Sequence, residues 1–246
     1  MIELNKIYNE DCLEGMKRIP DKSVDMILCD LPYGTTACKW DTIIPFEPLW
    51  EQYERIIKDD GAIVLTASQP FTSALVMSNP KMFRCEWIWD KKMGSNFFNV
   101  KHQPLKVHEQ VLVFSKKSPT YNPEMRKGKM RVKGSEKTYT GDSVLGTYTK
   151  TKKTNDLYYP TTMLEFSNAN RKDNTHPTQK PVELFEYLIR TYSTECDTIL
   201  DNCMGSGTTA IACINTNRNF IGFELDENYH TVANDRIAKH LLERGD

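Results

Sequence analysis

The sequence predicts an α/β protein built around a doubly wound sheet of mostly parallel strands. Two observations predict this fold class. Short apolar runs alternate with amphipathic helical segments along most of the chain, and a Gly-x-Gly turn joins one apolar run to the helix that follows it. Ligands of such sheets bind beyond the carboxyl ends of the strands. The residues that follow each predicted strand are therefore the first candidates for a functional site.

The elements before residue 116 follow from apolar periodicity and from residues that end helices. Residues 25–30 form an apolar run that ends in an acid, which is typical of a buried parallel strand. Pro20 ends the helix before this strand, and Gly61 ends the helix after it. The expected order is helix 12–19, strand 25–30, helix 48–58, strand 62–66, helix 71–77, and strands 86–89 and 110–115.

The elements after residue 172 begin with a helix that Pro181 opens. The Gly-x-Gly unit usually comes first in such a domain, but here it lies near the end of the chain. The remaining strands must come from upstream, so we expect a permuted strand order. The expected elements are helix 181–192, strand 198–201, helix 208–215, strand 219–224 and helix 227–243.

The composition is that of a soluble globular protein. The chain has 246 residues, of which 39% are hydrophobic and 26% are charged, and this length suits one domain with a substantial insert. No apolar run reaches the length of a membrane span, and the N-terminus lacks the pattern of an export signal. We therefore expect a cytoplasmic protein that has no membrane partner.

Positive charge is concentrated in one internal segment. Residues 116–172 contain 13 Lys or Arg against 5 Asp or Glu, whereas the rest of the chain contains 19 against 28. The segment is dense in Gly, Ser, Thr and Lys and lacks a sustained apolar period, so we expect an inserted, loop-rich subdomain. Tyrosines interleave with its cations, as stacking groups do in nucleic-acid sites. A solvated linker is the alternative interpretation.

The seven cysteines are scattered and contain no Cys-x-x-Cys pair. Without an export signal, this pattern predicts reduced thiols rather than a disulfide framework. The five histidines do not supply the short ligand spacing of a zinc site. No metal is therefore expected.

A cofactor loop is predicted at residues 198–209. The apolar run ends at Asp201, the turn contains Gly205 and Gly207, and a helix begins at Thr208. Glycines let the backbone turn sharply and approach a ligand closely. Glu224 lies 23 residues after Asp201, and an acid at about this distance commonly bonds a ribose hydroxyl. The segment therefore favours a nucleoside cofactor over a plain tight turn.

The segment from Asp30 to Tyr33 offers chemistry for a planar amine. Pro32 biases Leu31 toward an extended conformation, which fixes the direction of the Leu31 carbonyl. A carboxylate and a carbonyl then form two acceptors beside an aromatic ring. They fit a base with an exocyclic amino group, because the acceptors take its two N–H groups while the ring stacks on the base. Binding both hydrogens favours a tetrahedral and more nucleophilic nitrogen.

At these residues the chain resembles the amino-methylating DNA methyltransferases, specifically their permuted β class. Residues 30–33 are similar to the family's catalytic Asp-Pro-Pro-Tyr motif, with leucine in place of the first proline. Residues 201–209 resemble its S-adenosylmethionine loop, and residues 176–181 (HPTQKP) resemble the block that leads into this loop. The resemblance implies a Rossmann-like methyltransferase fold. Residues 1–115 and 173–246 would form one domain, and residues 116–172 would be an inserted target-recognition region.

The resemblance also implies roles for single residues. Asp30 and the Leu31 carbonyl would hold the target amine, Pro32 belongs to the same motif, and Tyr33 would stack. Trp40, Asp41 and residues 89–91 would wall the target pocket, and Lys180 would approach the carboxylate of the cofactor. The residues implied in cofactor binding are Asp11, Cys12, Asp30, His176, Thr178, Gln179, Lys180, Asp201, Cys203, Gly205, Ser206, Gly207, Thr208, Glu224 and Leu225.

By the same resemblance, the substrate is double-stranded DNA and the methyl donor is S-adenosylmethionine. Asp30 at the first position of the motif favours adenine N6 over cytosine N4 as the target. An N4-cytosine methyltransferase, a protein-glutamine methyltransferase and a non-catalytic DNA-binding protein are the alternatives. Many members of the class are dimers, so a homodimer is a further expectation. The expected DNA-binding residues are Lys127, Lys129, Arg131, Lys133, Lys152 and Lys153.

Overall fold

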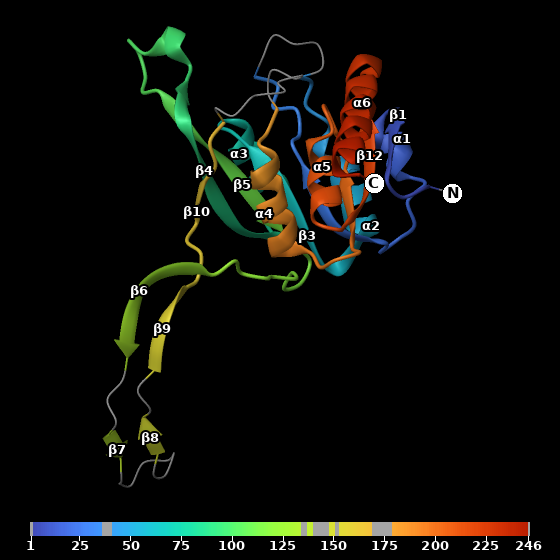
Figure 1. Cartoon of the computed structure of the whole chain (residues 1–246). Helices are drawn as coiled ribbons and strands as arrows, with labels where there is room; N and C mark the ends of the chain where they lie inside the picture. The colour runs from blue at the N-terminus through green and yellow to red at the C-terminus, as the bar shows by residue number, and fades with distance from the viewer. Residues whose placement is uncertain are drawn as a thin grey trace. The chain divides into compact units, whose positions relative to one another are not determined.

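The computed structural model describes residues 2–35, 41–133, 137–139, 148–150, 153–168 and 179–245. The chain divides into two compact units: the first contains Met1–Asn122 and Thr162–Asp246, and the second contains Pro123–Thr161. The first unit holds a large sheet and the helices that pack on it (Figure 1). The second unit lies within the basic insert.

The sheet of the first unit has eight strands in the order β1-β12-β11-β2-β3-β5-β4-β10. Every neighbouring pair is parallel except the pairs that β5 makes with β3 and β4, which are antiparallel. β11 and β12 come from the end of the chain and lie between β1 and β2, which confirms the permuted order. The strands are β1 (Lys6–Asn9), β2 (Val24–Cys29), β3 (Ile57–Ala67), β4 (Phe83–Ser95), β5 (Lys106–Phe114), β10 (Met163–Glu165), β11 (Thr198–Asp201) and β12 (Asn219–Glu224).

Helices cover both faces of this sheet, which confirms the doubly wound fold. Residues of α1, α2 and α3 pack on one face with Ile27 and Leu65, and residues of α4, α5 and α6 pack on the other with Met26 and Val64. Neighbouring residues of a strand point to opposite faces, so a strand buried on both faces needs a continuous apolar run. The helices are α1 (Cys12–Met16), α2 (Phe46–Ile56), α3 (Phe71–Ser78), α4 (Val182–Tyr192), α5 (Thr208–Asn215), α6 (Glu227–Arg244) and the 3₁₀ turn η1 (Phe97–Asn99).

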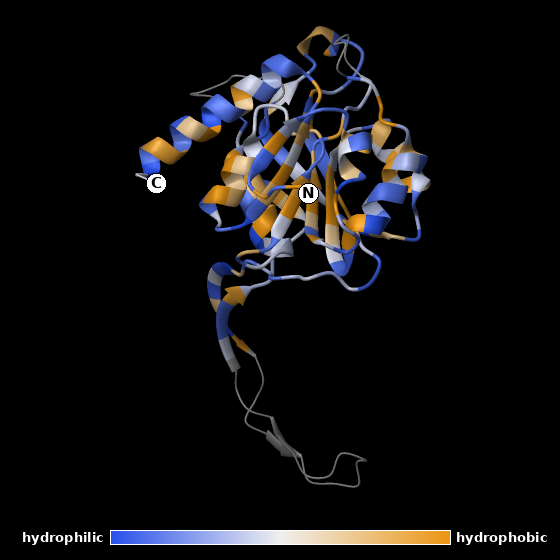
Figure 2. Ribbon diagram, turned by 90° about the vertical axis from the view of Figure 1, so that its right-hand side faces the viewer, coloured by the Kyte–Doolittle hydropathy of each residue, from blue (hydrophilic) through white to orange (hydrophobic). Residues whose placement is uncertain are grey.

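Hydropathy follows this layered arrangement. The strands of the sheet are predominantly apolar, whereas the C-terminal helix α6 alternates polar and apolar residues along its length (Figure 2). In the part of the chain that the structure describes, no helix is long and apolar enough to cross a membrane.

Several elements differ from the sequence-based expectation. β4 has 13 residues where four were expected, because β4 and β5 continue past the sheet as a hairpin with mixed polar and apolar side chains. β1 and β10 were not predicted, since strands of four and three residues give no clear period. α1 ends at Met16 rather than at residue 19, because the next residues form turns with hydrogen bonds to the third residue before them.

The second unit consists of two short antiparallel ladders. β6 (Arg126–Lys133) pairs with β9 (Lys153–Tyr158), and β7 (Lys137–Tyr139) pairs with β8 (Tyr148–Lys150). The Arg131 guanidinium lies over the ring of Tyr158, 3.9 Å from its centroid, and the Tyr158 hydroxyl donates to the Lys129 carbonyl at 2.7 Å. These contacts stabilise a hairpin that has no apolar core, as cation–π pairs do.

Asp201 holds the turn that leads from β11 into α5. Its carboxylate accepts from the Cys203 amide at 3.0 Å and from the Thr209 hydroxyl. The residue is only 2% exposed. Burial raises the pKa of Asp201 to about 6, even though both hydrogen bonds favour the charged form. The ionised carboxylate therefore costs folding free energy near neutral pH.

We expect Asp201→Asn to change how stability depends on pH. The folded-state pKa lies above the usual value of 3.8, so the ionisation cost is absent below about pH 4 and grows as the pH rises through 6. Between pH 4 and 7, the unfolding free energy of the variant should rise relative to wild type by up to about 3 kcal/mol. Urea unfolding at several pH values measures this difference. A difference that stays constant would contradict the assignment, and the exposed Asp235→Asn serves as the matched control.

Candidate functional site

The functional residues predicted from sequence meet at one edge of the sheet. β1, β2, β11 and β12 are parallel neighbours, so their carboxyl ends lie at the same edge. Asp11 follows β1, Asp30 follows β2 directly, the glycine turn follows β11, and Glu224 ends β12. Segments that are far apart in the sequence are thereby brought together.

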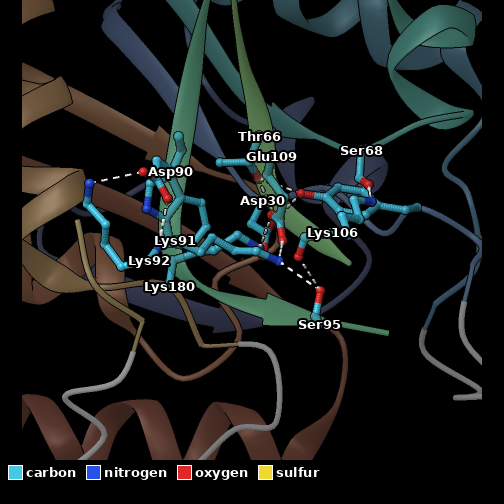
Figure 3. Close-up of polar contacts among 12 residues, drawn as sticks. Asp30, Thr66, Ser68, Asp90, Lys91, Lys92, Ser95, Lys106, Glu109 and Lys180 are labelled. Atoms are coloured by element: carbon cyan, nitrogen blue, oxygen red, sulfur yellow. Dashed lines mark hydrogen bonds and ion pairs between the residues drawn. The ribbon is translucent and has the colours of Figure 1, made fainter. Parts of the chain in front are cut away.

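Asp30 is held from both sides by hydrogen-bond donors (Figure 3). Its Oδ1 accepts from the Tyr33 hydroxyl at 2.8 Å and from the hydroxyl of Thr66 on β3. Its Oδ2 accepts from Lys180 Nζ at 2.5 Å. The carboxylate is one-quarter exposed. It is thus fixed in orientation while one side remains accessible.

Lys180 connects Asp30 to a second carboxylate. Its ammonium is 7% exposed and lies 3.6 Å from Glu109 Oε2, and Lys91 Nζ lies 3.0 Å from Glu109 Oε1. Burial lowers the pKa of Lys180, but the charges of Asp30 and Glu109 outweigh burial, and the net pKa is raised. Two cations and two carboxylates therefore alternate through this cluster (Figure 3).

Tyr33 presents a fixed, neutral ring. The ring stacks on Phe71 with centroids 5.3 Å apart and planes tilted by 26°. Its hydroxyl also reaches Thr66 Oγ1 at 3.0 Å. Burial, together with the Asp30 and Glu109 charges, raises the pKa of Tyr33 well above its usual value. The Lys180 ammonium lies 5.6 Å from the ring centroid.

The segment after Tyr33 is fixed by Asp41, whose carboxylate accepts from the amides of Gly34 and Thr35 at 2.8 and 2.9 Å. Leu31 is buried in the core, so the leucine that replaces proline adds packing on one face of the sheet. Trp40 lies outside the described residues. Asp41 orders the segment that follows Tyr33 by accepting hydrogen bonds from its main chain.

The glycine turn leaves an open backbone surface beside an acid. Gly205 and Gly207 have φ angles of +54° and +81°, which favour glycine, and a Cβ on Gly205 would meet nothing closer than 4.0 Å. Glu224 accepts from the Gly205 amide at 2.7 Å and from the Asp226 amide at 3.0 Å. Burial raises the pKa of Glu224. An open turn next to a fixed carboxylate fits the sugar of a nucleoside cofactor.

Asp11 and two thiols lie next to this turn. Asp11 caps α1 by accepting from the amides of Leu13 and Glu14 at 2.8 and 3.2 Å. The Asn202 amide donates to the sulfurs of Cys12 and Cys203 at 3.6 and 3.5 Å. A hydrogen bond from Cys203 lowers the pKa of Cys12. Cys12 is buried, and its sulfur contacts Asn202, the residue that follows β11.

The other residues expected to bind the cofactor differ in their contacts and exposure. The Ser206 hydroxyl donates to the Gln179 side-chain oxygen at 3.2 Å. Arg236 on α6 donates to the Ser206 carbonyl at 2.9 Å and to the Thr208 hydroxyl at 3.2 Å. Leu225 is 70% exposed, whereas the Asp201 carboxylate points into the turn and shapes it from inside. His176 and Thr178 lie outside the described residues.

Thr66, Glu109 and Arg236 belong to the site but were not among the residues expected from sequence. Thr66 ends the predicted strand 62–66, and Glu109 immediately precedes the predicted strand 110–115, so these positions at strand ends were the available signal. Lys91 was expected at the pocket wall and lies in the charge cluster. Its neighbour Trp89 is fully buried and donates to the Phe166 carbonyl at 2.8 Å, so Trp89 belongs to the core.

The described cysteines are all free, and within the described ranges no group of His, Cys, Asp and Glu is arranged to hold a metal ion. Cys38 lies outside those ranges.

The second unit carries the cations that were expected to bind DNA. Lys127 and Lys129 lie on β6 and are exposed. Arg131 is also on β6 and is engaged by Tyr158. Lys133 and Lys153 pair in register across the ladder, and Lys152 lies outside the described residues.

The chain is similar to known DNA methyltransferases. The DNA methylase family model N6_N4_Mtase matches residues 24–235. The chain is 28% identical to the type II methyltransferase M1.MboII of Moraxella bovis, over 95% of this chain and 96% of that protein. It is 27% identical to the type II methyltransferase M.HpaI of Haemophilus parainfluenzae, over 94% of this chain and 74% of that protein.

Solved structures share the fold. The complex of M1.HpyAVI with S-adenosylmethionine is similar with a TM-score of 0.63 and 25% identity, covering 94% of this chain and 98% of that one. The cytosine-N4-specific PvuII DNA methyltransferase is similar with a TM-score of 0.69 over 94% of this chain and 85% of that one. Its identity of 16% shows the fold alone. The family match spans most of the sequence, and the chain therefore belongs to the S-adenosylmethionine-dependent N6-adenine/N4-cytosine DNA methyltransferases.

Proposed function

We propose that the protein transfers the methyl group of S-adenosylmethionine to N6 of an adenine in double-stranded DNA. The observation that carries the proposal is the position of the Asp30 carboxylate. It lies at the carboxyl end of β2, next to β11 and the glycine turn that follows it, and it is oriented by Tyr33 and Thr66. An acceptor for an amine thus stands beside a turn that suits the methyl donor.

The proposed reaction depends on holding one nitrogen in line with the methyl sulfonium that the cofactor supplies. Asp30 and the Leu31 carbonyl accept the two N–H groups, and Tyr33 stacks on the base. The nitrogen gains positive charge during transfer, which the Asp30 carboxylate offsets. Positioning of this kind lowers a barrier by roughly 7–11 kcal/mol in favourable cases. The base must first leave the duplex, at a cost of a few kcal/mol.

The residues that would hold the cofactor surround the glycine turn. Glu224, Asp11 and Cys12 would meet its adenosine, and Gly205 to Gly207 would pass beneath it. Gln179 and Lys180, together with His176 and Thr178, would lie toward its amino-acid end. The open backbone at Gly205 supports this arrangement.

Adenine is proposed over cytosine because an acid occupies the first position of the catalytic segment. Both bases present an exocyclic amine with two hydrogens, so the contacts to Asp30 and Leu31 suit either. The N4-cytosine reaction is therefore the second candidate. It would use the same residues in the same roles.

The cations of the second unit would contact the DNA backbone. Lys127, Lys129 and Arg131, with Lys133, Lys152 and Lys153, form a segment of concentrated positive charge. Contacts of this kind make affinity strongly dependent on salt. Proteins recognise sequence through additional contacts to base edges.

The first unit also has a surface suited to a duplex. Residues 91–108 contain four lysines and no Asp or Glu, and they include the turn between β4 and β5. Phe97 and Phe98 in this turn are 61% and 102% exposed. β4 ends at the same sheet edge as β2 and β3, and Lys91 belongs to the Asp30 cluster. Exposed aromatic rings among cations suit contact with bases close to the target.

Asp30→Ala tests the active site. The variant should lose at least about 100-fold in kcat, because it removes the acceptor that positions the amine and offsets its charge. Its affinity for S-adenosylmethionine should change far less than kcat, because the glycine turn is unchanged. Transfer of a labelled methyl group to DNA and calorimetric titration of the cofactor measure the two quantities. Asp235→Ala is the matched control, and a wild-type rate for Asp30→Ala would refute the assignment.

Lys127→Ala/Lys129→Ala tests the proposed DNA contact. If each lysine neutralises one phosphate, the slope of log affinity against log salt should fall by up to about 2. Arg131 is retained because it packs on Tyr158. Fluorescence anisotropy with a labelled duplex at several salt concentrations gives the slope. The control, Lys17→Ala/Lys239→Ala, removes two exposed lysines from the first unit, and equal slopes for all three proteins would exclude the second unit from the interface.

A further inference from the structure

The Asp30 carboxylate is already occupied at the positions where the proposed function needs an amine to bind. Oδ1 is bonded by the hydroxyls of Tyr33 and Thr66, and Oδ2 is bonded by Lys180 Nζ. Each carboxylate oxygen accepts about two hydrogen bonds. An incoming amine therefore has to bind beside the Lys180 ammonium on Oδ2 or displace it.

Electrostatic repulsion makes it unfavourable for the amine and the Lys180 ammonium to share Oδ2 of Asp30. The amine nitrogen becomes positive as the methyl group is transferred, and a buried ammonium on the same oxygen repels that charge. The pKa of Lys180 is raised by Asp30 and Glu109, after burial has lowered it, so this ammonium stays charged at neutral pH. Methyl transfer therefore requires Lys180 to leave Asp30 Oδ2 for another carboxylate, which is either one of the protein or that of the cofactor, and the structure already places a protein carboxylate 3.6 Å from Lys180 Nζ.

Glu109 provides that carboxylate. Its Oε1 is held by Lys91 Nζ at 3.0 Å, whereas its Oε2 lies 3.6 Å from Lys180 Nζ. Among the residues that the structure describes, Glu109 Oε2 is the one buried side-chain polar atom without a hydrogen-bond partner. Buried polar atoms are seldom left in this state, because an unmade hydrogen bond costs free energy. A shift of the ammonium by about 1 Å would complete the bond.

We propose that Glu109 is a positioning residue that receives the Lys180 ammonium when the target amine binds Asp30. In the structure, the Lys180 ammonium occupies Oδ2 of Asp30. With a base in place, Lys180 moves to Glu109 Oε2, and Asp30 Oδ2 accepts the amine. Lys91 keeps Glu109 in position in both arrangements. This inference rests on the proposed function of Asp30 and adds a role for a strand, β5, that supplies none of the catalytic motif.

Glu109→Gln tests the proposal through the pH dependence of methyl transfer. The substitution preserves size and removes the charge that attracts Lys180, so the ammonium stays on Asp30. At pH 7 the kcat/KM for DNA should fall by about tenfold or more. The loss of one carboxylate also lowers the pKa of Lys180 in the variant. As the pH rises toward the lowered pKa of Lys180 in the variant, Lys180 loses its charge and releases Asp30, so the deficit should shrink, whereas the wild-type ammonium should stay charged to higher pH.

Two further variants separate positioning from general damage. Glu165→Gln removes a carboxylate from the neighbouring strand β10, where Glu165 is 65% exposed and pairs with Lys92, and it should follow the wild-type pH profile. Glu109→Asp restores the charge on a shorter side chain and should recover part of the rate at pH 7. All variants should bind S-adenosylmethionine within about twofold of wild type.

Two kinetic results would overturn the role of Glu109: a wild-type kcat/KM for Glu109→Gln at every pH, or a deficit of constant size across the pH range. A crystal structure of the wild-type protein with S-adenosylhomocysteine and duplex DNA gives a readout independent of turnover. Lys180 Nζ should lie within hydrogen-bond distance of Glu109 Oε2. An ammonium that is still on Asp30 beside a bound base, or one that bonds the carboxylate of S-adenosylhomocysteine and not Glu109, would overturn the proposal. Wild-type protein that methylates no DNA would instead overturn the proposed function itself.

Discussion

The ion pair between Lys180 and Asp30 joins two parts of the chain that are 150 residues apart. Asp30 follows the central strand β2, and Lys180 lies just before α4, at the entry to the segment that carries the glycine turn. The pair is mostly buried, so it depends on the second carboxylate, Glu109, and on the hydroxyl donors around Asp30. The segment that begins at Asp30 and the segment that contains Lys180 are thereby held together.

The permuted sheet makes this contact possible. β11 enters the sheet directly beside β2, so the turn after Asp201 and the segment after Cys29 emerge at the same edge. Internal hydrogen bonds of Asp201 then shape the turn, and Glu224 fixes it from β12. Chain order differs from spatial order here, and the spatial order is what places the glycine turn beside Asp30.

Much of this site could be predicted from sequence, because its main residues follow apolar runs. Asp30, Gly205 and Glu224 are recognisable as residues at strand ends. The residues around Asp30 were harder to find. Pairing of β2 with β3 brings Thr66 to Asp30, and pairing of β3 with β5 brings Glu109 to Lys180. Lys180 was expected near the cofactor, and its bond to Asp30 depends on tertiary structure. β6 and β9 gave no signal, because none of their described side chains is buried, and strands without a buried face carry no apolar period.

The most direct test of the central claim is the identity of the methylated base. Unmethylated double-stranded DNA of varied sequence is incubated with the protein and S-adenosylmethionine, hydrolysed to nucleosides, and separated by mass spectrometry. We expect N6-methyladenine among the nucleosides, and the Asp30→Ala protein should form none. N4-methylcytosine in its place would contradict the assignment of the base while keeping the same site. DNA without any methylated base would contradict the function proposed for this arrangement of residues.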